Sequence, residues 1–123
     1  MKCILVVDDD PVMRRMLRVK LKASGYTVKE ASGGSEAIRQ IRKGNVDLMV
    51  IDIVMPRKGG IETMIELNTE YPDLKTIVIT GHFPIESDAF QNIVKQFGAS
   101  HVFAKPLDMK AFLKALKDLL SDG

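Results

Sequence analysis

Several features that mark other classes of protein are missing from this sequence. It has no tryptophan and one cysteine, Cys3, so no disulfide can form within the chain. No apolar run approaches the roughly 20 residues of a membrane-spanning helix, and the N-terminus lacks a signal-peptide pattern. The 18 basic residues barely exceed the 16 acidic ones, which gives no argument for a nucleic-acid or membrane partner. We therefore expect a cytoplasmic protein in which Cys3 is a buried, reduced thiol.

The residues that are present suffice for one folded domain. Hydrophobic residues make up 46% and charged residues 28% of the 123 positions, which is ordinary for a globular domain with its own core. The chain contains no internal repeat, linker or low-complexity segment. Residues 1–123 are therefore predicted to form a single domain.

Apolar runs and helical periodicity alternate along the chain. The predicted strands are 3–7, 26–31, 48–52, 76–80 and 101–104, and only 26–31 alternates polar and apolar residues as a half-exposed edge strand does. The predicted helices are 11–23, 36–43, 61–70, 89–97 and a last one that buries Phe112, Leu116 and Leu120. Asp10 suits the N-cap and Pro11 the first position of the first helix, whereas residues 32–35 resemble a turn. Such alternation predicts a doubly wound parallel α/β sheet.

Polar side chains stand at the carboxyl ends of four strands that we take to be buried. Asp8 and Asp9, then Asp52, Thr80 and Lys105, each end or follow such a strand. Ligand sites of open parallel sheets lie at this edge, so these side chains are expected to converge. Three neighbouring carboxylates need a cation, and an all-oxygen set favours Mg²⁺. Asp52 would then act as a nucleophile toward phosphorus, with Thr80 and Lys105 contacting phosphoryl oxygens.

These residues belong to a larger pattern. The pattern consists of Asp8, Asp9, Asp52, Met55-Pro56, Gly60, Thr80, Gly81 and Lys105-Pro106. Over nearly its whole length the chain resembles the receiver domain of bacterial two-component response regulators. The resemblance implies a flavodoxin-like α/β fold with a five-stranded parallel sheet in the order 2-1-3-4-5 and helices on both faces.

The resemblance also implies a function as a phosphorelay signalling switch. Asp52 would accept a phosphoryl group from a phosphohistidine of a sensor histidine kinase or phosphotransfer protein. The domain would not be an enzyme in the usual sense, because it would catalyse only its own phosphoryl transfer and slow autodephosphorylation. The surface of the fourth helix, fifth strand and fifth helix would then control a downstream effector or an output domain. The sequence leaves open whether the chain acts alone or as part of a longer regulator.

The metal ligands follow from the same resemblance. Asp9 and Asp52 match the direct Mg²⁺ ligands of the family, together with the backbone carbonyl of Val54. Asp8 matches the carboxylate that holds a metal-bound water. His82 and Val54 stand where side chains can gate the water that hydrolyses the acyl phosphate, and we hypothesise that they set its lifetime; His82 as an ordinary exposed loop residue is an equally good interpretation.

The switch residues follow in the same way. Thr80 matches the switch hydroxyl and Lys105 the lysine of the family, and the peptide bond before Pro106 is expected to be cis. Val102 stands where receivers usually have an aromatic residue, and Phe103 should face the other side of the strand. The loop after Asp52 also departs from the family pattern, with Lys58 in place of an apolar residue and Gly59 in place of Asp or Asn.

Two other functions would use parts of the same pattern. A phosphohydrolase that works through an aspartyl phosphate would use Asp8 as nucleophile and Asp10 as acid. This alternative gives Asp52 no role. It also needs a second acidic pair after Lys105, which the sequence does not have. A flavin-binding module of similar topology is disfavoured because the acidic loop after the first strand would repel a phosphate.

Overall fold

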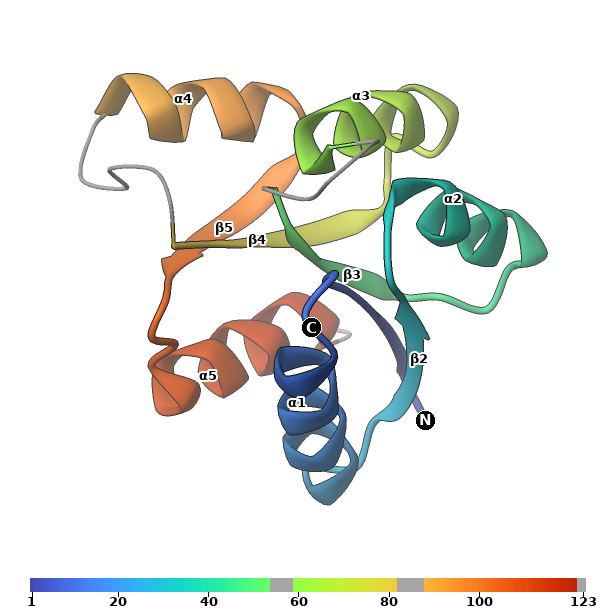
Figure 1. Ribbon diagram of the computed structural model, residues 1–123, viewed down its shortest axis with the longest axis vertical. Coiled ribbons are helices and arrows are strands. Elements are labelled where there is room, and N and C mark those ends of the chain that lie inside the picture. Colours follow the sequence, from blue (N-terminus) through green and yellow to red (C-terminus); the bar gives the residue numbers. More distant parts are fainter. Residues whose placement is uncertain (54–58, 82–87, 122–123) are drawn as a thin grey trace.

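The five strands form one parallel sheet with helices between them. A computed structural model describes residues 1–53, 59–81 and 88–121. The strands are β1 (Cys3–Val7), β2 (Thr27–Ala31), β3 (Leu48–Asp52), β4 (Lys75–Thr80) and β5 (Ala99–Ala104). The helices are α1 (Pro11–Ala23), α2 (Gly34–Lys43), α3 (Gly60–Glu70), α4 (Asp88–Gln96) and α5 (Met109–Leu120). The strand order is β2-β1-β3-β4-β5 (Figure 1), which confirms the predicted fold class and strand order.

Both faces of the sheet are covered. Helices α1 and α5 lie on one face, and α2, α3 and α4 lie on the other (Figure 1). Alternate residues of β1 therefore enter different hydrophobic clusters: Ile4 packs toward α1 and α5, whereas Leu5 packs toward α2 and α3. This two-sided burial explains why the central strands are continuous apolar runs. None of the helices in the described ranges has the length and apolarity needed to cross a membrane.

The ends of the helices follow local chemistry, with one difference from the prediction. The Asp10 side chain accepts a hydrogen bond of 2.9 Å from the Val12 amide, and Pro11 is the first helical residue, as predicted. Residues 32–35 do not form a free turn, because α2 already begins at Gly34. Gly33 is its N-cap and its carbonyl accepts the Ala37 amide at 3.0 Å, so the first turn forms without a side-chain cap.

Strand β5 is an edge strand and is less buried than predicted, since its last three residues are only half-buried. It pairs only with β4, so one side of its backbone faces away from the sheet, and Ser100 and His101 are exposed. Val102 and Phe103 do lie on opposite faces, as predicted: Val102 packs against the cluster under α2 and α3. Phe103 contacts Phe112 of α5 edge to face, with ring centroids 5.8 Å apart.

The single cysteine lies in the interior of the sheet. Cys3 begins β1, is 6% exposed and is a free thiol. Burial raises the pKa of this thiol above its usual value, because the thiolate would lose its hydration. Cys3 is therefore held in its unreactive, protonated form, as expected of a structural position.

Candidate functional site

Three carboxylates meet at the carboxyl edge of the sheet. Asp52 is the last residue of β3 and Asp8 follows β1, whose Val7 pairs with Ile51 of β3, so the sheet register brings the two side chains together. Three carboxylate oxygens, one each from Asp8, Asp9 and Asp52, lie within 4.8 Å of one another. Asp8 and Asp52 are only 3% and 4% exposed, whereas Asp9 is exposed. The predicted convergence of the three acidic residues is thus observed.

Lys105 reaches this cluster from the far side of β4. Its Nζ lies 2.9 Å from Asp52 Oδ2 and 3.4 Å from Asp8 Oδ2. The aliphatic part of the side chain passes alongside Gly81, where a Cβ would lie 3.4 Å from Lys105 Cβ. The Lys105 amide donates a hydrogen bond of 3.0 Å to the Thr80 carbonyl. The peptide bond between Lys105 and Pro106 is cis, as predicted.

Thr80 lies at the same edge of the sheet. It is the last residue of β4, is fully buried and pairs with Ala104, the residue before Lys105. Asp52 pairs with Ile79 in the neighbouring register, so Thr80 is one residue beyond the position opposite Asp52. All four predicted strand ends therefore contribute to one edge.

Burial and charge shift the proton affinities of this cluster. Removal from water raises the pKa of Asp8, and the negative charge of Asp52 raises it too; the Asp10 amide and Lys105 oppose this shift but do not cancel it. Burial by itself lowers the pKa of Lys105, yet its hydrogen bond to Asp52 and the nearby carboxylates raise it overall. The ammonium therefore stays charged at neutral pH. Three carboxylates against one ammonium leave excess negative charge among oxygen donors, a set that fits Mg²⁺.

Asp8 is held by backbone contacts on several sides. Its amide donates to the Ala31 carbonyl at 3.2 Å, and its Oδ1 accepts the Asp10 amide at 2.9 Å. Its carbonyl accepts a hydrogen bond of 2.7 Å from Arg14 Nη1. Arg14 was not among the predicted site residues. Its place in α1 could have indicated this contact. Helical side chains point toward the helix N-terminus, so an arginine near the start of the helix can reach the loop before it.

Some predicted site residues cannot be placed. The Val54 carbonyl, Met55-Pro56, Lys58 and His82 lie outside the described residues. The gating hypothesis for His82 and Val54 therefore stays a prediction. Gly59 is described and is the N-cap of α3, with no side-chain hydrogen bond to cap that helix.

The acid that the phosphohydrolase alternative requires has another role. Asp10 is exposed, and its carboxylate accepts the Val12 amide at the start of α1. Such a carboxylate stabilises the helix, because it accepts a hydrogen bond from a first-turn amide that has no partner within the helix. The geometry gives no support to Asp10 as a catalytic acid.

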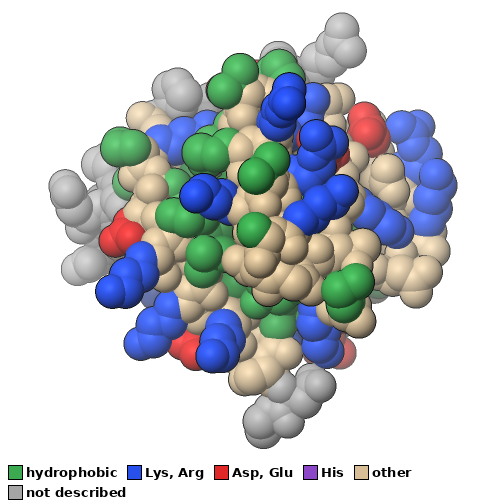
Figure 2. All heavy atoms as spheres, turned by 90° about the horizontal axis from the view of Figure 1, so that it is seen from below, with side chains coloured by type: hydrophobic (Ala, Val, Ile, Leu, Met, Phe, Trp, Pro, Cys, Tyr) green, Lys and Arg blue, Asp and Glu red, His purple; other side chains and the backbone are tan. Residues whose placement is uncertain are grey.

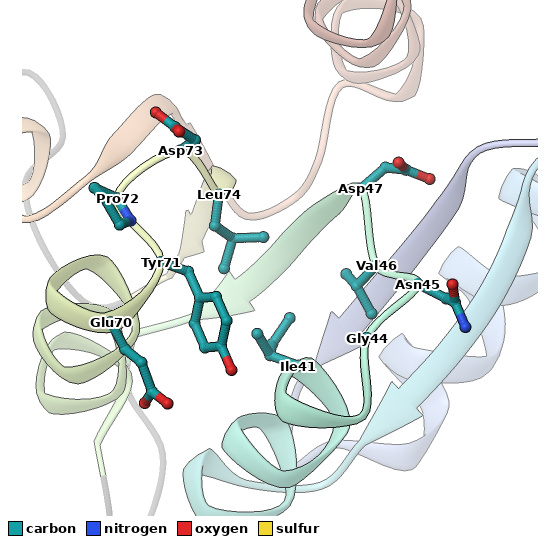
Figure 3. A pocket seen from close by; sticks show the side chains of 10 residues that line it. All are labelled: Ile41, Gly44, Asn45, Val46, Asp47, Glu70, Tyr71, Pro72, Asp73 and Leu74. Atoms are coloured by element: carbon teal, nitrogen blue, oxygen red, sulfur yellow. The ribbon is translucent and has the colours of Figure 1, made fainter.

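The chain also has a hollow far from these carboxylates. It measures about 490 Å³ and lies between the C-terminal ends of α2 and α3, at the amino edge of the sheet (Figure 3). Its wall includes Ile41, Val46, Tyr71 and Leu74, while Asp73 directs its carboxylate away from them (Figure 3). The hollow is also lined by Asp47 and Glu70. Among the described residues, the acidic groups that lie close enough together to hold a metal ion are those at the carboxyl edge.

Comparison with known proteins agrees with this location. Residues 4–117 match the model of the response regulator receiver domain. Response regulator MprA of Mycobacterium ulcerans is 35% identical over 117 residues, which are 95% of this chain and 49% of MprA. The response regulator TrrA of Thermotoga maritima, solved in complex with Mg²⁺-BeF, is 32% identical with a TM-score of 0.84, over 98% of this chain and all of TrrA.

A second structure shows TrrA in complex with the histidine kinase ThkA. In that structure TrrA is 34% identical to this chain with a TM-score of 0.85, and the match covers 98% of this chain and 100% of TrrA. The chain spans about a quarter to a half of the length of the first curated relatives it matches. The family match supports the receiver interpretation and gives no support to the phosphohydrolase alternative. By its family match, its sheet order and its converging strand ends, this chain belongs to the receiver domains of two-component response regulators.

Proposed function

We propose that residues 1–123 form one receiver domain and that Asp52 is its phosphoacceptor. The observation that carries this proposal is the contact between Lys105 Nζ and Asp52 Oδ2 at 2.9 Å, with Asp8 and Asp9 close by. A buried carboxylate beside an ammonium, within a cluster suited to a divalent cation, is a receptor for a phosphoryl group. We also propose a cytoplasmic location, which fractionation of cells would test.

The proposed cofactor is Mg²⁺. Asp9, Asp52 and the carbonyl of Val54 would bind it directly, and Asp8 would hold a water of its shell. When bound, it supplies positive charge that offsets the charge of the phosphoryl oxygens during transfer. The complex of TrrA with Mg²⁺-BeF supports this assignment, since TrrA is a relative of similar fold.

The transfer itself needs few groups. An Asp52 carboxylate oxygen attacks the phosphorus of a phosphohistidine, the new P–O bond forms as the P–N bond breaks, and the leaving imidazole nitrogen takes a proton from solvent. Lys105 is placed to exchange its contact with Asp52 for one with a phosphoryl oxygen. The Thr80 hydroxyl would donate to another oxygen. Because the acceptor is the protein itself, the product is a modified switch rather than a released compound.

The modification would change the surface of α4, β5 and α5. A phosphoryl group adds about −1.5 to −2 charges and strong acceptor oxygens at Asp52. Thr80 is joined to Lys105 through the hydrogen bond between their backbones, so movement at Thr80 reaches the end of β5. A ligand-stabilised shift between two conformations would then alter binding to an effector or an output domain.

The phosphodonor protein is proposed to dock on α1. This helix exposes Val12, Met16 and Val19, at 76%, 39% and 56%, along one side. It carries five basic and no acidic residues, and Lys and Arg side chains surround exposed apolar ones on the face of α1 and α5 (Figure 2). An exposed apolar stripe beside charged groups is typical of a protein interface. The helix begins directly after Asp8–Asp10, so a partner there would have its phosphohistidine next to Asp52.

Replacement of Asp52 by asparagine tests the proposed function. We expect the wild type to gain one labile phosphate when incubated with Mg²⁺ and acetyl phosphate, and Asp52→Asn to gain none, because the amide is not a nucleophile. The measurement is intact mass before and after incubation, with Asp10→Asn as a variant that should still be modified, because Asp10 caps α1 and asparagine can do the same. A wild type that stays unmodified while a known receiver is modified would refute the proposal.

Replacement of Val19 by glutamate tests the docking face. We expect transfer from a purified histidine kinase that phosphorylates the wild type to fall by about tenfold, since loss of an exposed apolar contact costs about 1.4 kcal/mol. Modification by acetyl phosphate should not change, because that donor needs no docking. Ile65→Glu is the matched control, since Ile65 is 42% exposed on α3. Equal transfer to both variants would exclude α1 as the docking face.

A further inference from the structure

We propose that Arg14 is a positioning residue of the metal site, anchored by Glu30 of β2. This inference rests on the proposed function and deepens it. Arg14 contacts no carboxylate of the acidic cluster among the interactions described; it acts on the backbone that carries them. Its Nη1 donates a hydrogen bond of 2.7 Å to the carbonyl of Asp8.

That carbonyl belongs to the peptide joining Asp8 to Asp9. The neighbouring groups of Asp8 are held elsewhere: the amide by Ala31 and Oδ1 by the Asp10 amide. The Asp8 carbonyl follows the last residue of β1, so the sheet does not fix it. Asp9 is the exposed member of the cluster. The direction of its side chain depends on the orientation of this peptide. The hydrogen bond from Arg14 therefore sets where the Asp9 carboxylate points.

Arg14 is itself held in place from the sheet. Its Nε lies 3.5 Å from Glu30 Oε1, and the Arg14 side chain is only 19% exposed. Arg18, one helical turn further along α1, lies 3.1 Å from the other oxygen of Glu30. Glu30 stands on β2 opposite Val6 of β1, so its backbone is fixed by the sheet and its carboxylate is held by the two arginines. The chain of contacts runs from β2 through Glu30 and Arg14 to the peptide before Asp9.

The positive charge of Arg14 would weaken metal binding, whereas the hydrogen bond that it donates to the Asp8 carbonyl would strengthen it. A guanidinium near a cation site repels the cation, so loss of the charge alone would strengthen metal binding. Loss of the positioning hydrogen bond would weaken it, because partners that orient a metal ligand typically contribute about 10- to 100-fold in affinity. The two roles therefore predict opposite signs for the same substitution.

The experiment measures Mn²⁺ affinity of the full chain by electron paramagnetic resonance, since Mn²⁺ accepts the same oxygen ligands as Mg²⁺. We expect Arg14→Met to weaken binding about tenfold and Arg14→Lys to restore part of it. Arg15→Met is the matched control, because Arg15 is exposed and carries the same charge one residue away. It should leave affinity equal to or slightly above that of the wild type.

Glu30→Gln removes the anchor of Arg14 and covers the case in which Arg14→Met folds poorly. Because loss of the Glu30 charge would also weaken cation binding, the double variant is what separates positioning from charge. We expect Glu30→Gln to weaken binding, by less than Arg14→Met does, and to add nothing in the double variant, because Glu30 acts through Arg14.

In the metal-free protein, the amide proton of Asp10 should exchange faster in Arg14→Met, since its acceptor Asp8 is less well held.

The outcomes separate this inference from the proposed function. If the wild type binds Mn²⁺ and Arg14→Met binds it as well as Arg15→Met does, the positioning role is wrong and the metal site stands. If the wild type binds no Mn²⁺, the metal site is wrong and the role of Arg14 falls with it. Equal losses in Arg14→Met and Arg14→Lys with unchanged Asp10 exchange would also overturn the role.

Discussion

Replacement of Gly60 by alanine is expected to destabilise the protein by about 3 kcal/mol and to lower its Tm by about 10 °C. Gly60 is buried at the start of α3, where its amide donates to the Ile53 carbonyl at 3.2 Å. A Cβ there would lie 2.3 Å from Ile53 Cα and 2.6 Å from the Asp52 carbonyl oxygen. Both are backbone atoms, so the clash cannot be relieved by rotating a side chain. Thermal unfolding followed by circular dichroism measures the effect.

The same substitution should impair phosphorylation, because the segment it displaces carries Asp52. We expect slower modification by acetyl phosphate even at temperatures where Gly60→Ala is folded. Gly59→Ala is the matched control: a Cβ at Gly59 meets nothing within 4 Å. Its Tm should change by only a few degrees, since the loss of a glycine N-cap and the gain in backbone rigidity are both small. If the two variants unfold alike, the close approach of α3 to the end of β3 is not what requires glycine at position 60.

The sequence was sufficient to predict the acidic cluster because one rule determines it. In a parallel sheet, residues that follow paired strand positions meet at one edge, so Asp8 and Asp52 converge once β1 and β3 are neighbours. The same rule places Lys105 at this edge, because it follows β5, but its contact with Asp52 depends on a side chain that crosses β4.

Other features could not be predicted because they depend on how elements pack. Val12 and Met16 continue the apolar spacing of Leu17 and Leu21, yet they are exposed, since the sheet covers a narrower stripe of α1 than the periodicity suggests. By its sequence pattern, Arg14 belongs to the solvated face of the same helix. Its contact with the Asp8 carbonyl depends on the path of the loop before α1. The partial exposure of β5, by contrast, follows from its place at the sheet edge, which the predicted strand order already implied.

Removal of the buried charge at Asp8 is expected to stabilise the metal-free protein, although it damages the proposed site. Asp8→Asn should raise the free energy of unfolding at neutral pH by about 1 kcal/mol, as often happens when a functional carboxylate is neutralised. The amide is similar in shape, and its oxygen can still accept the Asp10 amide. Urea unfolding in the presence of a chelator measures the gain.

The gain should depend on pH in a defined direction. Because the folded-state pKa of Asp8 is raised, the native state binds this proton more tightly than the unfolded state does. The stability that Asp8 contributes is present below its unfolded pKa of about 3.9 and is lost as the pH rises through its folded pKa. Asp8→Asn should therefore show little advantage near pH 4 and a growing one toward neutral pH. An advantage that shrinks as the pH rises would contradict the raised pKa.

Lys105→Met should have the opposite effect, because it removes the ammonium that both buried carboxylates contact. We expect a loss of about 2 kcal/mol at neutral pH, below the roughly 3–5 kcal/mol of a fully buried pair, since the Lys105 side chain is 27% exposed. Acid should restore part of this stability by protonating Asp8, whose pKa is raised by burial. Excess MgCl2 should raise the Tm of the wild type and of Lys105→Met by mass action, and that of Asp8→Asn much less. The carboxylate that costs stability without a metal would thereby contribute to stability with one, which is the behaviour of a binding site rather than of a structural ion pair.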